Sequence, residues 1–192
     1  MLNNNFEKFG ENIFVYKNFL SKEEISSILN SVQKFDDSEW SETGGSHVVS
    51  PWIETIEFVS DRIKENIPEP LEPHGRVACV VRMKKGGYWG EHVDNYDHEG
   101  VVDKADLYVE GMDYEEKKIT EYGIIIYLNN DFVGGELYYP NQDLVYTPNP
   151  GDLVIHAAKE ECRHGVKEIT DGVRYTITSS VYKTVRVPKE NG

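Results

Sequence analysis

The sequence of 192 residues predicts a single domain of mainly β structure with helices near its N-terminus, an α+β fold. Two observations support this prediction. Helical spacing of apolar residues is confined to residues 1–67, and short β-like runs separated by turns fill the second half. No stretch of about 18 apolar residues occurs, so no membrane-spanning helix is expected. β-like runs of this length and spacing are typical of a sandwich or a jelly roll.

The N-terminal part, residues 1–74, is predicted to hold one strand and two helices. The strand covers Ile13–Phe19. A helix follows it, because Ser21 is a favourable N-cap with Glu24 at the capping-box position, before an apolar stripe made of Ile25, Ile28, Leu29 and Val32. Residues 36–50 read as a loop, and a second helix is expected from Pro51 to Ile67.

The remaining part, residues 75–185, is predicted to form the β core. Its β-rich runs are Arg76–Lys84, Tyr122–Leu128, Glu136–Tyr139, Asp152–His156 and Val173–Lys183. Residues 95–120 interrupt this pattern and are expected to form an insertion, with Gly100 and Gly111 as hinges of a lid.

Charge excludes one class of partner. The chain has 20 Lys and Arg against 34 Asp and Glu, a formal net charge of −14, and no basic run, so nucleic acid is not an expected partner. More than half of the excess acid lies in Glu91–Glu121. This segment is either a solvated loop or an electrostatic funnel for a cationic partner such as a Lys- and Arg-rich, proline-containing protein segment. With two cysteines, Cys79 and Cys162, and no recognisable export signal, a reduced, cytoplasmic protein is expected.

A metal site is indicated by His92 and Asp94. Positions i and i+2 of a strand face the same side, so one imidazole and one carboxylate can converge on one ion, although such a pair also occurs on plain surface turns. His164 is the best candidate for a third ligand, because it lies in a turn just before the last strand. Two His and one carboxylate leave coordination positions open, as in non-heme Fe(II) oxygenases.

Arg174 lies ten residues after His164 in the last strand. Alternation places Arg174, Thr176 and Thr178 on one face, and an Arg that points into a sandwich is costly unless it meets an anion. Its planar fork fits a carboxylate in bidentate geometry, which a cosubstrate or an internal Asp could supply.

The β core resembles a known family. The matching segments are residues 76–95, 124–140, 148–156 and 164–178, and they resemble, in order and spacing, the 2-oxoglutarate- and Fe(II)-dependent dioxygenases of the prolyl 4-hydroxylase-like branch. Residues 13–25 also look like the N-terminal strand and helix of that branch. The resemblance implies a double-stranded β-helix, or jelly roll, as the core, with Fe(II), 2-oxoglutarate and O₂ as cofactor and cosubstrates.

The resemblance also implies roles for single residues. His92, Asp94 and His164 match the iron ligands. The expected 2-oxoglutarate contacts are Arg174, Tyr127, Thr176 and Leu137. Many relatives have a Tyr at the place of Met83 and a Trp at the place of Ser180, so the substrate contacts differ; Arg82, Tyr88 and Trp89 are our candidates for them. Among the other histidines, His156 is expected to be a packed or hydrogen-bonded ring, whereas His47 and His74 are expected in solvated loops.

The implied activity is hydroxylation of a prolyl residue in a protein or peptide, with succinate and CO₂ as co-products. One alternative is a hydroxylase of a free amino acid or another small molecule. An alternative from another class is a catalytically silent jelly-roll module that binds partners. The oligomeric state does not follow from the sequence.

Overall fold

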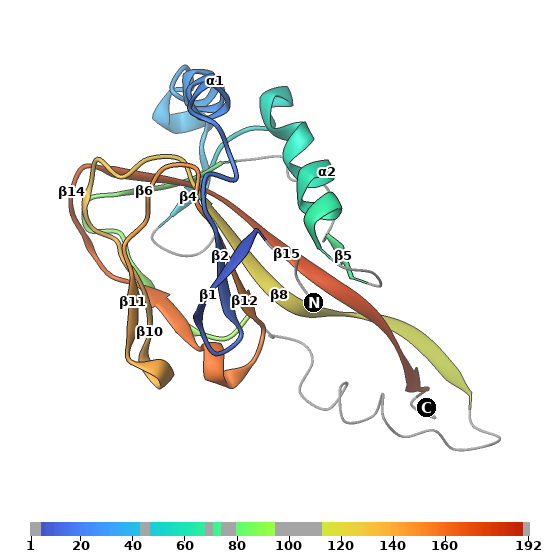
Figure 1. Ribbon diagram of the computed structural model, residues 1–192. Helices are drawn as coiled ribbons and strands as arrows, with labels where there is room; N and C mark the ends of the chain where they lie inside the picture. The colour runs from blue at the N-terminus through green and yellow to red at the C-terminus, as the bar shows by residue number, and fades with distance from the viewer. Residues whose placement is uncertain (1–4, 43–46, 68–70, 74–79, 95–112, 190–192) are drawn as a thin grey trace.

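Figure 1 shows a computed structural model of the protein. The structure describes residues 5–42, 47–67, 71–73, 80–94 and 113–189. Two β-sheets pack against each other, and two helices lie over the outer face of the larger one. This is the mainly β, jelly-roll architecture that the sequence predicts.

The larger sheet has nine strands in the order β1-β2-β12-β8-β15-β6-β4-β3, with β5 paired to β15. The strand bounds are Phe6–Gly10 (β1), Ile13–Tyr16 (β2), Ser41–Glu42 (β3), Val48–Val49 (β4), Glu72–Pro73 (β5), Val81–Lys84 (β6), Tyr114–Tyr127 (β8), Leu153–Ala157 (β12) and Val173–Pro188 (β15). β3 and β4 lie within residues 36–50, which the sequence predicts as loop.

The smaller sheet has four strands in the order β11-β10-β13-β7. These are Trp89–His92 (β7), Leu137–Tyr139 (β10), Leu144–Tyr146 (β11) and His164–Val166 (β13), and a separate pair joins Val133–Gly134 (β9) to Ile169–Asp171 (β14). The pairing of β7 with β13 brings two of the predicted metal ligands together, because it places His92 directly opposite His164.

Two α-helices precede the core. α1 covers Lys22–Val32 and begins with the predicted capping box: the Glu24 N–H donates to Ser21 Oγ (3.2 Å), and the Ser21 N–H donates to the Glu24 carboxylate (2.8 Å). α2 covers Glu57–Asn66 after the 3₁₀ turn Glu54–Ile56, so the second helix begins later than the predicted Pro51. Among the described residues, neither helix has the length and apolar character that a membrane crossing requires.

Alternation along the central strands separates two apolar cores. One face of β8, β12 and β15 packs against the helices through residues such as Ile126, Ile155 and Ile177. The other face looks into the space between the sheets, where Tyr127 and Val154 pack with Leu137. A residue's place in the strand period therefore decides whether it faces the helices or the interior of the jelly roll.

A long β-ribbon extends from the body of the molecule, as Figure 1 shows for β8 and β15. The two strands stay paired from Thr176 and Tyr127 to Pro188 and Tyr114, whereas β12 covers β8 only from Tyr122 to Ile126. Of the predicted insertion at 95–120, residues 114–120 belong to β8 and form part of this ribbon. Residues 95–112, with the predicted hinges Gly100 and Gly111, lie outside the described residues, as do Cys79, His74 and His98.

Candidate active site

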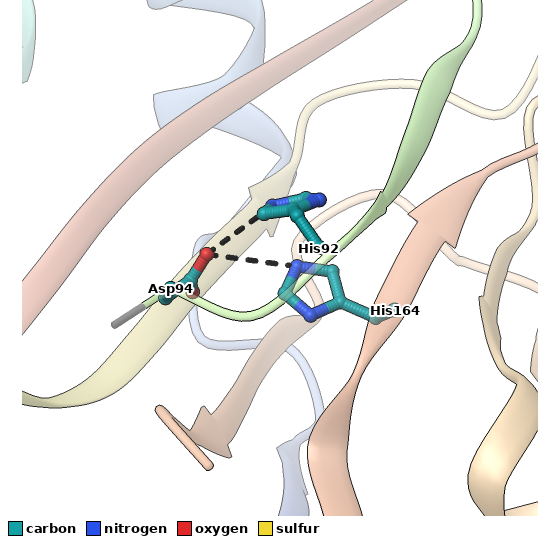
Figure 2. A group of neighbouring side chains, drawn as sticks. All are labelled: His92, Asp94 and His164. Carbon is teal, nitrogen blue, oxygen red and sulfur yellow. Dashed lines mark ion pairs between the residues drawn. The ribbon is translucent and has the colours of Figure 1, made fainter. Parts of the chain in front are cut away.

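His92, Asp94 and His164 lie together at the place where the two sheets meet, as Figure 2 shows. Their potential ligand atoms all lie within 4.8 Å of one another. The Asp94 Oδ1 atom is 3.3 Å from His92 Nε2 and 3.8 Å from His164 Nε2. His92 and His164 are 72 positions apart in the sequence, and the structure brings both together with Asp94, as the sequence predicts.

The two imidazoles are oriented by backbone carbonyl groups. His92 Nδ1 is 2.9 Å from the Gly90 carbonyl oxygen, and His164 Nδ1 is 3.0 Å from that of Cys162. A carbonyl oxygen only accepts hydrogen bonds, so each Nδ1 carries a proton and each Nε2, on the side of Asp94, is the nitrogen available to a metal ion. This is the arrangement in which outer hydrogen bonds fix metal-binding imidazoles.

Burial and charge set the protonation states. Burial and the neighbouring His156 lower the pKa of His164 to about 3, so this imidazole is neutral near pH 7. Burial opposes ionisation of Asp94, but hydrogen bonds with His156 and His92 outweigh it and hold the pKa of this carboxyl well below its usual value. The site therefore offers a carboxylate and a neutral imidazole, which is the donor chemistry that a divalent cation requires.

A second cluster of buried polar side chains lies on β8 and β15, where Thr176 is paired with Tyr127. Arg174 is 3% exposed and stacks over the ring of Tyr127, with its guanidinium carbon 5.0 Å from the ring centroid. Arg174 Nη1 approaches Thr176 Oγ1 at 3.4 Å. Within the described part of the chain, Arg174 Nε and Nη2 and the Tyr127 hydroxyl are buried and have no hydrogen-bond partner.

These buried donors without a partner indicate a ligand site. Buried donors are almost always paired, and an unpaired buried guanidinium is especially costly. An internal Arg–Asp ion pair, one sequence-based interpretation of Arg174, is not formed among the described residues. Leu137, which is fully buried, contributes to the same interior core. Burial raises the pKa of Tyr127, despite the nearby charge of Arg174, so its hydroxyl keeps a proton to donate.

The three candidate substrate residues lie in different places. Arg82 is opposite Tyr175 in the β6–β15 pairing, so it faces the helices, and it pairs with Asp37 at 2.9 Å and lies over Trp40. Alternation therefore turns Arg82 away from the site, and Met83, opposite Arg174, faces the interior.

Tyr88 and Trp89 remain near the site. With Tyr138, Val166, Lys167 and Glu168, they line a shallow hollow of about 390 Å³. Tyr88 is 56% exposed, and the Trp89 ring lies 5.9 Å from that of His92. This hollow therefore adjoins the predicted metal ligands.

Two histidines have roles that sequence reasoning did not assign. His47, expected in a solvated loop, lies with its ring 4.3 Å from that of Trp89, and burial and the charge of Arg174 lower its pKa. His156 is buried and hydrogen-bonded, as expected, but its partner is Asp94, at 3.0 Å. No signal in the sequence connects positions 94 and 156.

Comparison with known proteins identifies the class. A model of the 2OG-Fe(II) oxygenase superfamily matches residues 78–182, more than half of the chain, so the chain belongs to this superfamily. It is a dioxygenase, with Fe(II) as its metal and 2-oxoglutarate and O₂ as cosubstrates, which confirms the class predicted from the sequence. A search of curated proteins found no match.

Solved structures with the same fold include prolyl hydroxylases. The viral collagen prolyl hydroxylase of Paramecium bursaria Chlorella virus-1, in a 2-oxoglutarate complex, matches with a TM-score of 0.64 at 18% identity, over 94% of this chain and 98% of that one. A Trichoplax adhaerens prolyl hydroxylase in complex with a hypoxia-inducible factor peptide fragment has a TM-score of 0.65 at 19% identity, over 89% and 83%. A Pseudomonas putida prolyl-4-hydroxylase has 0.60 at 14%, over 90% and 92%. At these identities the likeness concerns the fold, and it agrees with the predicted prolyl 4-hydroxylase-like branch.

Proposed function

We propose that His92, Asp94 and His164 bind the Fe(II) of this oxygenase. Two imidazole nitrogens and one carboxylate oxygen lie within reach of one ion, and each imidazole is held by a carbonyl oxygen behind it. Bound there, Fe(II) supplies the chemistry by which O₂ oxidises 2-oxoglutarate to succinate and CO₂ and hydroxylates a C–H bond. The part of the protein is to hold the metal on one face and leave the opposite positions open.

The 2-oxoglutarate site is proposed at Arg174, Tyr127 and Thr176. Arg174 donates from Nε and Nη2 to the carboxylate remote from the metal, and the Tyr127 hydroxyl donates a further hydrogen bond. Thr176 steadies the guanidinium, and Leu137 closes the apolar wall of the pocket. The observation that carries this assignment is that the buried donors of Arg174 and Tyr127 lack any partner in the described part of the chain.

We further propose that the substrate is a prolyl residue in a protein or peptide. The supporting observation is the likeness in fold to three prolyl hydroxylases over nearly the whole chain, one of them in complex with a peptide fragment. The hollow beside His92 adds local support, because Tyr88, Trp89 and Tyr138 give it aromatic walls. Aromatic walls suit proline-containing segments in extended conformation.

A basic peptide is the first substrate to try, given the net charge of −14. The described acids of the β-ribbon contribute little to such attraction, because they pair with cations of the ribbon itself. The pairs are Glu115 with Lys117, Glu116 with Arg186, Glu121 with Lys183, and Asp113 with Lys189. Any preference for Lys and Arg would therefore depend on other acidic residues.

The test is to incubate the full chain with Fe(II), 2-oxoglutarate, O₂ and a pool of proline-containing peptides, basic and neutral. Mass spectrometry should locate a gain of one oxygen on proline in a subset of peptides. Tyr88→Ala should raise the KM for those peptides and leave the KM for 2-oxoglutarate unchanged, with the Trp52→Ala variant, also an exposed aromatic, as the matched control. Consumption of 2-oxoglutarate without any peptide product would refute the prolyl proposal and favour a small-molecule substrate.

A further inference from the structure

The two oxygens of the Asp94 carboxylate have different surroundings. Oδ1 faces the imidazoles of His92 and His164, whereas Oδ2 lies 3.0 Å from His156 Nε2. From this geometry we infer that His156 is a positioning residue: it holds Oδ2, so that Asp94 offers only Oδ1 to the metal. The inference rests on the proposed metal site and adds a residue to it.

Hydrogen-bond chemistry fixes the direction of the contact. An ionised carboxylate only accepts, so His156 donates from Nε2. Its other nitrogen, Nδ1, lies 3.0 Å from the Tyr139 hydroxyl. Burial raises the pKa of Tyr139 well above 10, so this hydroxyl keeps its proton and donates to Nδ1. Tyr139, His156 and Asp94 thus form a chain of donors that ends on the carboxylate.

The space for this contact depends on Gly123. Gly123 is directly opposite His156 in the pairing of β12 with β8. A Cβ atom at this position would lie 1.8 Å from Asp94 Oδ2 and 2.7 Å from His156 Nε2. Because even the smallest side chain would displace the carboxylate, the absence of a side chain at position 123 is what allows Asp94 to reach His156.

The Asp94 carboxylate needs to be held because of the position of this residue after the end of β7. β7 ends at His92, so Asp94 is beyond the last ladder pairing and its backbone is not fixed by the sheet. A carboxylate free to rotate can present both oxygens to a metal and thereby occupy a position that 2-oxoglutarate or O₂ requires. His156 prevents this rotation, since Oδ2 is engaged on the side away from the imidazoles.

His156 is not itself a ligand in this arrangement. The group of ligand atoms within 4.8 Å of one another consists of His92, Asp94 and His164. His156 Nε2 points at the carboxylate with its proton, and its lone pair at Nδ1 is taken by Tyr139. It acts through Asp94.

The experiment compares His156→Phe, which keeps a buried ring without a donor, with His156→Gln, which returns an N–H at similar reach. Mn(II) binding to the full chain is measured by electron paramagnetic resonance, and thermal unfolding of the metal-free protein reports on the fold. His156→Phe should weaken Mn(II) binding by about 10–100-fold, the usual loss for an outer hydrogen-bond partner, and His156→Gln should recover most of it. Tyr139→Phe should give a smaller loss in the same direction.

Tyr146→Phe is the matched control. It removes a buried hydroxyl that donates to another carboxylate, Asp152, at 2.6 Å, so it changes stability without changing Mn(II) affinity. Binding by His156→Phe as tight as by wild type would overturn the inference. So would a failed rescue by His156→Gln in a folded variant, or X-ray absorption that finds three imidazoles on the metal. Absence of Mn(II) binding by wild type would instead overturn the metal site itself, and the inference with it.

Discussion

Replacing Arg174 with Met should weaken 2-oxoglutarate binding and, at the same time, stabilise the protein without ligand. Arg174 Nε and Nη2 are buried donors without a partner in the described chain. Each hydrogen bond to a charged group contributes about 1.5–3 kcal/mol, so two of them give at least about 3 kcal/mol. This corresponds to a loss of about 100-fold or more in affinity.

The stability change has the opposite sign. An unpaired buried polar group costs about 1–3 kcal/mol, and more when charged, whereas a Met of similar length leaves no donor unpaired. The contact of Arg174 over Tyr127 is lost, but a thioether also packs favourably against an aromatic ring. The net gain should be about 1–2 kcal/mol, which raises Tm by about 2–8 °C in a chain of this size.

Thermal unfolding with and without 2-oxoglutarate, in the presence of Mn(II), measures both effects. Ligand at 100 times the wild-type Kd stabilises the wild type by about 2.7 kcal/mol, whereas the Arg174→Met variant should gain about 0.4 kcal/mol or less at that concentration. Arg82→Met is the matched control, because Arg82 is also buried but is paired with Asp37 and stacked on Trp40, on the opposite face of the sheet. This control should lose stability and keep the response to 2-oxoglutarate. An Arg174→Met variant that binds 2-oxoglutarate normally, or that loses stability as Arg82→Met does, would refute the reasoning.

Three further predictions concern single side chains. Hydrogen bonds from Arg62 lower the pKa of Glu24 from 4.5 to about 2. The pair therefore stabilises the fold fully above about pH 5 and less as the pH falls toward 2. In urea unfolding, Glu24→Gln should lower the free energy of unfolding by about 1 kcal/mol at pH 7 and by little near pH 2. Gly123→Ala should abolish Mn(II) binding in titrations, because its Cβ displaces the Asp94 carboxylate. Tyr127→Phe should weaken 2-oxoglutarate binding about threefold to tenfold in calorimetry without lowering Tm, since its hydroxyl has no partner within the described residues.

Strand alternation and motif spacing were enough to predict much of the site. Alternation alone places Arg174 and Thr176 on the interior face, where the structure has them beside Tyr127. The relative position of His92 and Asp94 follows from local sequence alone, because the two residues are only two positions apart at the end of a strand. The position of His164 just before the last strand, together with the resemblance, indicated the third residue, which the pairing of β7 with β13 brings opposite His92.

What the sequence did not predict depends on contacts between distant segments. Residues 114–120 carry charges without alternating apolar positions, so they resemble a loop, and only the pairing with β15 makes them a strand. His156 meets Asp94 across 62 positions, and the contact requires that Gly123 leave the space between them. The face of the sheet on which Arg82 lies follows from the pairing of β6 with β15, which is not encoded locally.

The measurement that tests the central claim most directly is succinate formation from 2-oxoglutarate under O₂, with and without Fe(II), by wild type, His164→Ala and Arg174→Met. The account predicts Fe(II)-dependent succinate from wild type. At subsaturating 2-oxoglutarate, it predicts no succinate from His164→Ala and about a hundredth of the wild-type rate from Arg174→Met. Only Arg174→Met should act through a higher KM for 2-oxoglutarate. Equal turnover by wild type and His164→Ala, with both proteins folded, would contradict the proposed metal site.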